Sequence, residues 1–320
     1  MLSRVADNLY WMARYLERAE HGARVLDVKL EAMLEEAAED TAEGWVRALA
    51  TLTNPMASWG IAAPSDIAHR LTFDRQSNNS VLMCIRYARD NARQMREQIS
   101  TEMWGRLNRL YLRASDPEAE REWRRAPVPF LNGVIDDLMM FSGLTDSTMR
   151  HGEGWHFIQI GRYLERAQCV SRLLDVYFGD LPDDVPYKLR APRYADWIGL
   201  LKQCTGFEAY CKVYTADVDP NRIAEFLLLD AEFPHSLRFS VDRLNDELLA
   251  IGPGAAGGPQ RKAERLAGRL KASLDYGQVD ELLGGDIDHF LHDVQERCVE
   301  IHESVFDAFI AYGVEDLLRA

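Results

Sequence analysis

Hydrophobic residues recur at helical spacing from the start of the chain. Intervals of three and four residues separate Leu9, Met12, Leu16, Ala19, Ala23, Leu26 and Leu30. That spacing places them along one face of a helix, and Ser3 is a residue type that caps helix N-termini. We therefore predict a long amphipathic helix that begins near Ser3 and buries this face.

The same periodicity continues over most of the sequence and predicts no strand. Further helices are expected at about 43–53, 64–71, 79–112, 116–144, 153–178, 193–215, 220–229, 235–250, 260–276 and 286–312. Asp180–Pro192, with three prolines, and the glycine-rich Gly252–Pro259 are expected to be loops. Both are short and lie between strongly apolar helices, so we expect residues 1–320 to form a single all-α domain, a multi-helix bundle.

One segment of the chain occurs twice. RYLERAEHGARVLDV at Arg14–Val28 and RYLERAQCVSRLLDV at Arg162–Val176 share 10 identities in 15 aligned positions. With average residue usage, chance would give about one. Self-similarity of this kind indicates a repeat architecture.

The similarity continues downstream in the same order. Trp45 and Leu49 align with Trp197 and Leu201, and Pro64–Ser80 aligns with Pro220–Ser236. The offset grows from 148 to 152 and then 156 residues, as two small insertions would produce. We therefore predict an internal duplication, with a first repeat at about 1–147 and a second at about 148–320. Leu-Glu-Arg occurs at 16–18 and again at 164–166, and the two helices that carry it are here named the LER helices. They are expected to face one another across a pseudo-two-fold axis.

The two LER helices share charged residues that an ordinary solvated face would be free to change. The candidate ligand-binding residues are Arg14, Glu17, Arg18, Arg24, Arg162, Glu165, Arg166 and Arg172. Each glutamate lies three residues from one arginine and next to another, so one interpretation is a set of buried ion pairs that orient helices. The other is a ligand pocket in which arginines bind a carboxylate or phosphate and Glu17 or Glu165 acts as a catalytic base. The pocket interpretation predicts that Glu17→Gln and Glu165→Gln abolish function with almost unchanged melting temperature.

A second pair of sites precedes two helices. Asp74 and Asp230 lie the same distance before Ser80 and Ser236, and His235 adjoins the second serine. Helix capping accounts for this pattern, although free N–H groups at a helix start also attract anions. Because adjacent residues seldom meet in triad geometry, His235 and Ser236 do not predict a hydrolase.

Composition narrows the function classes. The net charge of −14 disfavours nucleic-acid binding, and no apolar stretch is long enough to span a membrane. The start lacks the features of a signal peptide, and the five cysteines contain no CxxC, which favours a reducing cytoplasm. No cofactor is expected, because no nucleotide-binding glycine loop occurs. No metal is expected either, although one helical face carries His289, His292, Asp293, Glu296 and Glu300.

The combination of DNLYWMARYLERAE, NNSVLMCIRYARDNARQMREQIS and FLLLDAEFPHSLRFSV resembles the alpha-E family across essentially the whole chain. The ER pair of that family falls on Glu17 and Arg18 and, in the second repeat, on Glu165 and Arg166. The resemblance implies a bacterial protein that works with a circularly permuted ATP-grasp ligase, with transglutaminase-like proteins as further candidate partners.

The expected function is therefore an accessory helical subunit of an ATP-grasp amide-ligase or peptide-modification system. It would bind the ligase or its peptide or amino-acid substrate. The alternative is an enzyme in its own right that acts on an activated acyl or peptide intermediate with Glu17 or Glu165 as general base.

Overall fold

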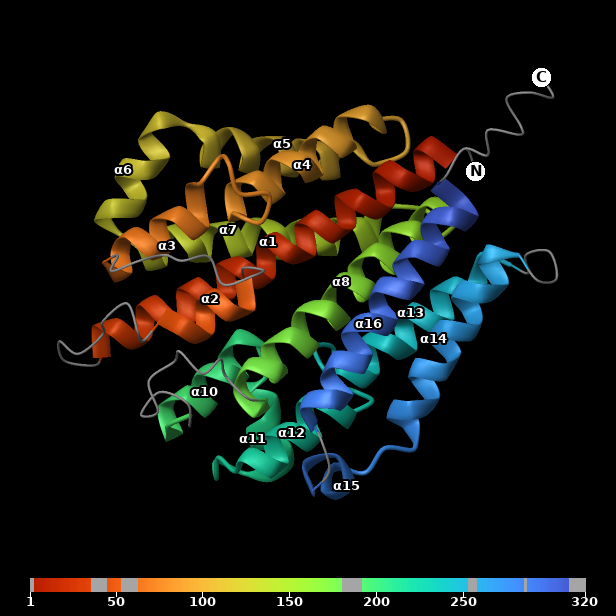
Figure 1. Ribbon diagram of the computed structural model, residues 1–320. Helices are drawn as coiled ribbons and strands as arrows, with labels where there is room; N and C mark the ends of the chain where they lie inside the picture. The colour runs from red at the N-terminus through yellow and green to blue at the C-terminus, as the bar shows by residue number, and fades with distance from the viewer. Residues whose placement is uncertain are drawn as a thin grey trace.

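A computed structural model describes residues 3–35, 45–52, 63–179, 192–252, 258–284 and 287–310. Within these ranges every regular element is a helix and none is a strand (Figure 1). The all-α prediction is confirmed. The predicted loops at 180–192 and 252–259 lie largely outside the described residues.

Two long helices form the centre of the molecule. Helix α1 (Ser3–Glu35) and helix α8 (Glu153–Phe178) lie side by side and run in the same direction, diagonally across Figure 1. The predicted apolar face of α1 is buried along its whole length, from Leu9 to Leu30. Helix α8 has the predicted bounds.

A glycine permits the close approach of these two helices. A Cβ atom at Gly161 would clash with the carbonyl oxygen of Tyr10 and would lie 3.3 Å from the Cβ of Ala13. Two small residues at the crossing therefore bring the backbones of α1 and α8 together. Side chains that follow on both helices are consequently within reach of each other.

Each central helix is the core of its own bundle. Helix α1 packs against α4 (Val81–Gln94) and α7 (Pro127–Thr148), and α5 (Thr101–Ser115) packs against both of these. In the same way, α8 packs against α13 (Leu237–Ala250) and α16 (Ile287–Val305), with α14 (Pro259–Asp275) against both.

The hydrophobic core divides along the same line. One cluster of buried residues extends from Ala6 to Ile158, and a second comprises Tyr10 and residues from Ile160 to Ile310. This division falls close to the boundary inferred for the two repeats.

Two short helices cross between the halves. Helix α2 (Val46–Leu52) packs on α8, whereas α10 (Tyr194–Gln203) packs on α1. Helix α3 (Pro64–Phe73) packs on α4, and α12 (Pro220–Leu229) on α13. The packing partners thus occur in the same order in both halves. A duplication accounts for this order and stays a prediction.

The remaining elements lie at the ends of the bundles. They are α6 (Pro117–Arg125), α11 (Phe207–Tyr214), α15 (Val279–Gly284) and a π-helical turn at Phe306–Ile310. Helix α15 was not predicted, and the predicted helix at 286–312 is α-helical only to Val305.

Three predicted helices are interrupted. The span 79–112 breaks after Gln94 because the Ser100 hydroxyl accepts a hydrogen bond from the Met103 amide and starts a new helix. The span 116–144 breaks at Pro127, which begins α7. The span 193–215 breaks at Thr205, whose positive φ of 54° is incompatible with a continuing helix.

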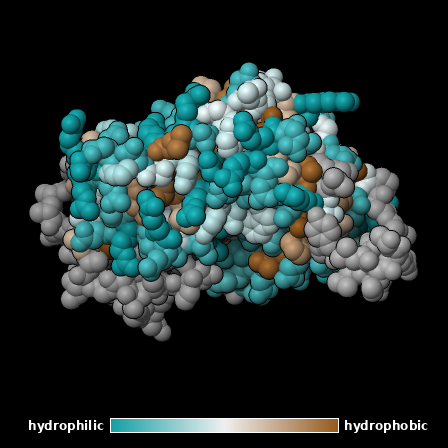
Figure 2. All heavy atoms as spheres, turned by 90° about the horizontal axis from the view of Figure 1, so that it is seen from above, coloured by the Kyte–Doolittle hydropathy of each residue, from teal (hydrophilic) through white to brown (hydrophobic). Residues whose placement is uncertain are grey.

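Three further observations concern the surface, the cysteines and the apolar character of the helices. The face seen in Figure 2 is mostly hydrophilic, with hydrophobic residues in small separate groups. All five cysteines are free. Among the described helices, none combines the length and the apolar character that a bilayer crossing requires.

Candidate functional site

The two ER segments meet at the interface of α1 and α8. The Glu165 carboxylate accepts hydrogen bonds from the Nε atoms of Arg14 and Arg18, each at 2.6 Å. Arg14 also donates to the side-chain oxygen of Gln168. The side chains of Arg14 and Glu165 are only 5% and 4% exposed, so this is a buried ion pair between helices.

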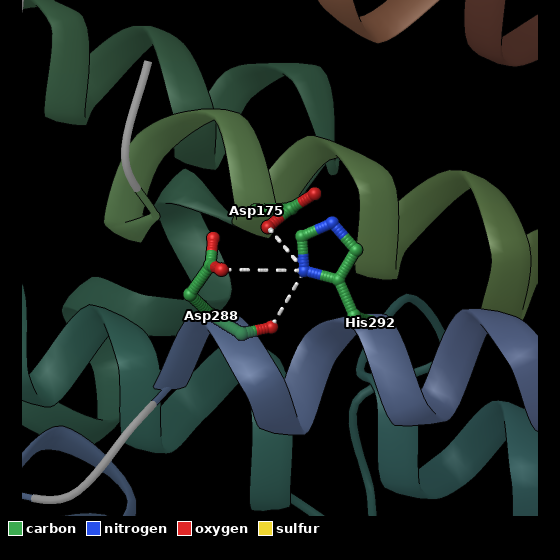
Figure 3. Close-up of side chains that lie close together, drawn as sticks. All are labelled: Asp175, Asp288 and His292. Atoms are coloured by element: carbon green, nitrogen blue, oxygen red, sulfur yellow. Dashed lines mark hydrogen bonds and ion pairs between the residues drawn. The ribbon is translucent and has the colours of Figure 1, made fainter. Parts of the chain in front are cut away.

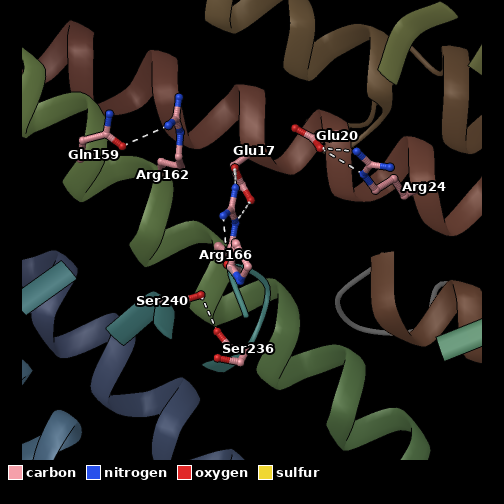
Figure 4. A network of polar contacts seen from close by, with 9 residues as sticks. Glu17, Glu20, Arg24, Gln159, Arg162, Arg166, Ser236 and Ser240 are labelled. Atoms are coloured by element: carbon pink, nitrogen blue, oxygen red, sulfur yellow. Dashed lines mark hydrogen bonds and ion pairs between the residues drawn. The ribbon is translucent and has the colours of Figure 1, made fainter. Parts of the chain in front are cut away.

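The second glutamate makes the converse contact. Arg166 of α8 donates from Nε and Nη2 to the two oxygens of Glu17, at 2.5 and 3.0 Å, and from Nη1 to the carbonyl of Pro234 (Figure 4). The sequence suggested pairing with arginines close by on the same helix. Instead each glutamate binds arginine of the other helix, because the close crossing at Gly161 brings the two segments face to face.

The guanidinium groups decide the charge state of Glu165. Burial alone would raise the pKa of this carboxyl group, but the charges and hydrogen bonds of Arg14 and Arg18 outweigh burial and lower the pKa to about 2. Despite burial, the pKa of Arg14 is raised by Tyr10 and then by Glu165, and the pKa of Arg18 is raised by Glu165. Glu165 is therefore a carboxylate at any physiological pH.

The network around Glu165 extends to α16. The Tyr10 hydroxyl lies 3.3 Å from Nη1 of Arg14 and 2.8 Å from Nδ1 of His302. Burial lowers the pKa of His302 to about 4 and raises that of Tyr10 to about 12. The Nδ1 atom of a neutral His302 can accept a hydrogen bond from the Tyr10 hydroxyl, while the hydroxyl oxygen accepts one from Arg14. No pattern in the sequence indicates this connection.

A pocket of about 170 Å³, here named the Glu165 pocket, opens beside the Arg18–Glu165 pair. It is lined by Arg18, His21, Thr51, Leu52, Asn79, Glu165, Gln168, Cys169 and Arg172. Burial lowers the pKa of His21 to about 4 and raises that of the Cys169 thiol. The pocket therefore contains a neutral imidazole and a protonated thiol, which is not the activated pair of a cysteine nucleophile.

A much smaller pocket, here named the Glu17 pocket, lies beside the Arg166–Glu17 pair. Its volume is about 10 Å³. It is lined by Glu17, Glu20, His21, Arg24, Arg166, Cys169, Val170, Gln203 and His235. His235 is a neutral ring, because burial lowers its pKa well below the usual value.

The two pockets correspond to each other under the offsets found in the sequence. His21 and Cys169 are 148 residues apart and line both pockets. Every other lining residue except Leu52 and Val170 has its counterpart in the other pocket: Arg18 and Arg166, Glu165 and Glu17, Gln168 and Glu20, Arg172 and Arg24, Thr51 and Gln203, Asn79 and His235. A duplication would account for this correspondence and stays a prediction.

The remaining predicted arginines behave differently from one another. Arg24 binds the Glu20 carboxylate with Nε and Nη2, at 3.0 and 2.8 Å (Figure 4). Arg162 donates to Gln159 and lies outside both pockets. Arg172 makes no hydrogen bond or ion pair with any residue in the part of the chain that the structure describes.

The secondary candidates cap helices. Ser80 accepts from the Met83 amide, and Ser236 accepts from the Phe239 amide. Each serine hydroxyl also donates to the carbonyl of the preceding aspartate, Asp74 or Asp230, whose carboxylates accept backbone amides of the same turn. His235 lines the Glu17 pocket but has no hydrogen bond to Ser236 among the described residues.

One acidic and histidine cluster joins α8 to α16. Asp175, Asp288 and His292 place one ligand atom each within 4.8 Å of one another (Figure 3). Of the acidic and histidine residues that the sequence analysis placed on one helical face, only His292 belongs to this cluster. Its Nδ1 lies 2.9 Å from the Asp288 carbonyl and 3.4 Å from that carboxylate, and its side chain is 57% exposed. The geometry is that of a partly exposed ion-pair group, in which the Asp175 side chain is 19% exposed and the Asp288 side chain 43%.

Sequence reasoning missed the neutral lining of the pockets. Asn79, Thr51 and Gln168 carry no charge pattern of their own. Their only signal is position, because each corresponds by a repeat offset to a residue of the Glu17 pocket. Tyr10 and His302 have no such signal.

Comparison with known proteins places the chain in a family. The alpha-E family, described as a predicted alpha-helical domain with a conserved ER motif, matches residues 1–310. Uncharacterised proteins of Mycobacterium bovis and Mycobacterium tuberculosis are 26% identical over an alignment of 341 positions, which covers 99% of this chain and 36% of theirs. The chain thus spans about a third of the length of these relatives. No solved structure matches it. With its two ER segments bound crosswise at the centre of an all-helical fold, the chain belongs to the alpha-E family.

Proposed function

We propose that this protein is an accessory helical subunit of an ATP-grasp amide-ligase or peptide-modification system, and that it binds the ligase or its substrate. The observation that carries the proposal is the use of the ER glutamates. Both oxygens of Glu165 and of Glu17 accept hydrogen bonds from guanidinium groups. The motif thereby shapes a pocket instead of presenting a free base.

The relatives add support. In the mycobacterial proteins the matching region is 36% of a longer polypeptide, so it is attached there to further chain. The family resemblance suggests an ATP-grasp ligase as the partner. The sequence contains no glycine loop for phosphate, which suits a subunit that leaves ATP chemistry to the ligase.

The alternative of a general base is less favoured by the geometry. A base must be free to accept a proton near the working pH, whereas the pKa of Glu165 is about 2. Protonation of Glu165 would also leave Arg14 and Arg18 without their counter-ion.

Co-purification tests the proposal. The protein is co-expressed with an affinity-tagged, circularly permuted ATP-grasp ligase of the same organism, with a transglutaminase-like protein as a second bait. We expect the ligase to retain the protein and to turn over ATP and peptide substrate faster in its presence. Separate elution together with unchanged ligase turnover would contradict the proposal. So would conversion of an acyl phosphate or amino acid by the purified protein alone.

A further inference from the structure

The Glu165 pocket contains a cation that is not neutralised. Arg172 lines the pocket and, among the described residues, has no acidic or hydrogen-bonding partner. Its counterpart Arg24 binds Glu20, four residues earlier on α1. Both arginines are partly buried side chains on equivalent helices. The difference between them therefore needs an explanation in the sequence.

One substitution between the repeats explains it. The position four residues before Arg172 is Gln168, which corresponds to Glu20. An amide replaces the carboxylate, and its oxygen accepts from Arg14 of the other helix. Arg172 consequently has no negative charge on its own helix at the place where Arg24 has one.

The charges that line the two pockets differ as a result. The Glu165 pocket has two guanidinium groups, Arg18 and Arg172, and one carboxylate. The Glu17 pocket has two of each, Arg24 and Arg166 with Glu17 and Glu20. Both shared side chains, His21 and Cys169, are uncharged at neutral pH. Of these two pockets, the Glu165 pocket therefore carries a net positive charge of one unit and the Glu17 pocket carries none.

The Glu165 pocket, which carries the net positive charge, is also the larger of the two pockets. One water molecule needs a cavity of about 10 to 15 Å³, so the Glu17 pocket has space for about one water molecule. The Glu165 pocket, at about 170 Å³, has space for a group as large as a small amino acid. A ligand that fits is thus confined to one side of the pseudo-two-fold axis.

The chemistry of the lining selects the ligand. One uncompensated guanidinium suits a carboxylate, which it can bind through two parallel hydrogen bonds. An amine finds no acceptor charge, because both oxygens of Glu165 are already bound to Arg14 and Arg18. We propose that the Glu165 pocket binds one carboxylate-bearing amino acid or peptide C-terminus per chain, held by Arg172. The role of this ligand as the ligase substrate rests on the function proposed above.

Titration calorimetry on the purified chain tests this inference without any ligase. The probe is N-acetyl-L-alanine, with the neutral N-acetyl-L-alaninamide and inorganic phosphate as comparisons. We expect N-acetyl-L-alanine to bind with a stoichiometry of one, and tighter than phosphate, while the amide does not bind. Arg172→Gln should weaken binding of N-acetyl-L-alanine at least tenfold. Gln168→Glu, which restores the acid that Arg24 has, should do the same.

Arg24→Gln is the matched control, since it removes the equivalent guanidinium from the small pocket. It should leave the affinity unchanged, and circular dichroism should show all variants folded. The inference is overturned if the native chain does not bind the probe, if phosphate or the amide binds as well, or if Arg24→Gln weakens binding as much as Arg172→Gln. Because no ligase is present, these results are independent of co-purification, which can succeed or fail on its own.

Discussion

The Glu165 and Glu17 sides of the α1–α8 interface are built from the same residue types but are not equivalent. Glu165 is bound by two arginines of α1, whereas Glu17 is bound by one arginine of α8. Arg162, which corresponds to Arg14, turns away to Gln159. The Glu165 side also continues through Tyr10 to His302, and the position 148 residues beyond Tyr10 is an apolar residue, Ile158.

This comparison shows that a repeated motif need not repeat its role. The ER pairs hold the two central helices together on both sides. Neighbouring residues then determine whether the pocket beside each ER pair has free volume and an uncompensated arginine. Among the described residues, Gln168 leaves Arg172 without an acidic partner beside a pocket of about 170 Å³, while Glu20 neutralises Arg24 beside one of about 10 Å³. The predictions below test this difference, starting with the largest effect.

Loss of either central carboxylate should destabilise the fold, and loss of Glu165 should do so more. Removal of one partner of a buried ion pair costs about 3 to 5 kcal/mol. Glu165→Gln leaves Arg14 and Arg18 without a counter-ion, and we expect roughly 5 kcal/mol. Glu17→Gln leaves only Arg166, which keeps its bond to the Pro234 carbonyl, and we expect roughly 3 kcal/mol. Urea unfolding measures both values.

This expectation follows the ion-pair interpretation of the sequence and differs from the pocket interpretation, in which both variants would keep their melting temperature. Equal losses for the two variants would mean that the second arginine at Glu165 adds nothing. Losses below about 1 kcal/mol, the value of an exposed pair, would contradict the buried network altogether.

His302, which joins the Glu165 side through Tyr10, should make stability depend on pH. His21 of the Glu165 pocket, whose pKa is also about 4, adds a dependence of the same sign. The folded-state pKa of His302 is about 4, below its ordinary value of 6.5. Between these values the unfolded chain binds more protons than the folded one, so the free energy of unfolding falls as pH decreases from about 6.5 towards 4. At pH 5 this single group accounts for about 2 kcal/mol.

His302→Asn removes the titration and keeps an acceptor for the Tyr10 hydroxyl. The loss of unfolding free energy between pH 7.5 and 5.0 should therefore be about 2 kcal/mol smaller in this variant than in the native chain. The same change at His151, an exposed residue, should leave the pH dependence unaltered. An unchanged pH dependence in His302→Asn would show that His302 is not neutral in the folded protein.

The contact shared by both sides should be sensitive to a single methyl group. A Cβ at Gly161 meets the Tyr10 carbonyl, which is backbone and cannot move alone. Gly161→Ala should therefore cost about 1 to 3 kcal/mol through overpacking, although alanine favours helix. Gly143, on α7 with nothing within 4 Å of an added Cβ, is the matched control and should gain stability when changed to alanine. If both changes stabilise the protein, the crossing is looser than described.

The sequence predicted the long helices well because their apolar faces have a strong period. Helix α8 and the buried face of α1 were predicted correctly. The breaks at Ser100 and Thr205 were not, since one depends on a side-chain cap and the other on a local backbone turn. Neither leaves a mark on hydrophobic periodicity.

The repeat alignment was the strongest guide to the candidate site. It identified Arg14, Arg18 and Glu165 as residues under shared constraint, and the structure brings them together. It could not show that pairing crosses between helices, because that depends on how closely α1 and α8 approach. Nor could it show that Arg172 has no acidic partner among the described residues. That depends on the side chain of Gln168, which is uncharged and accepts a hydrogen bond from Arg14.

The smallest predicted effect separates the two equivalent arginines by stability alone. An exposed i, i+4 ion pair on a helix stabilises by about 0.2 to 0.5 kcal/mol. The Arg24 and Glu20 side chains are only 13% and 14% exposed, so Arg24→Gln should lose at least that amount with the Glu20 bond. Arg172 forms no such pair, and its charge lies beside Arg18 at the same pocket, so Arg172→Gln should be neutral or slightly stabilising. Replicate urea unfolding at low ionic strength, where such pairs are least screened, resolves the sign. If replacement of Arg172 weakens ligand binding but not the fold, this arginine serves binding. If Arg172→Gln and Arg24→Gln lose the same stability, both arginines serve the fold instead.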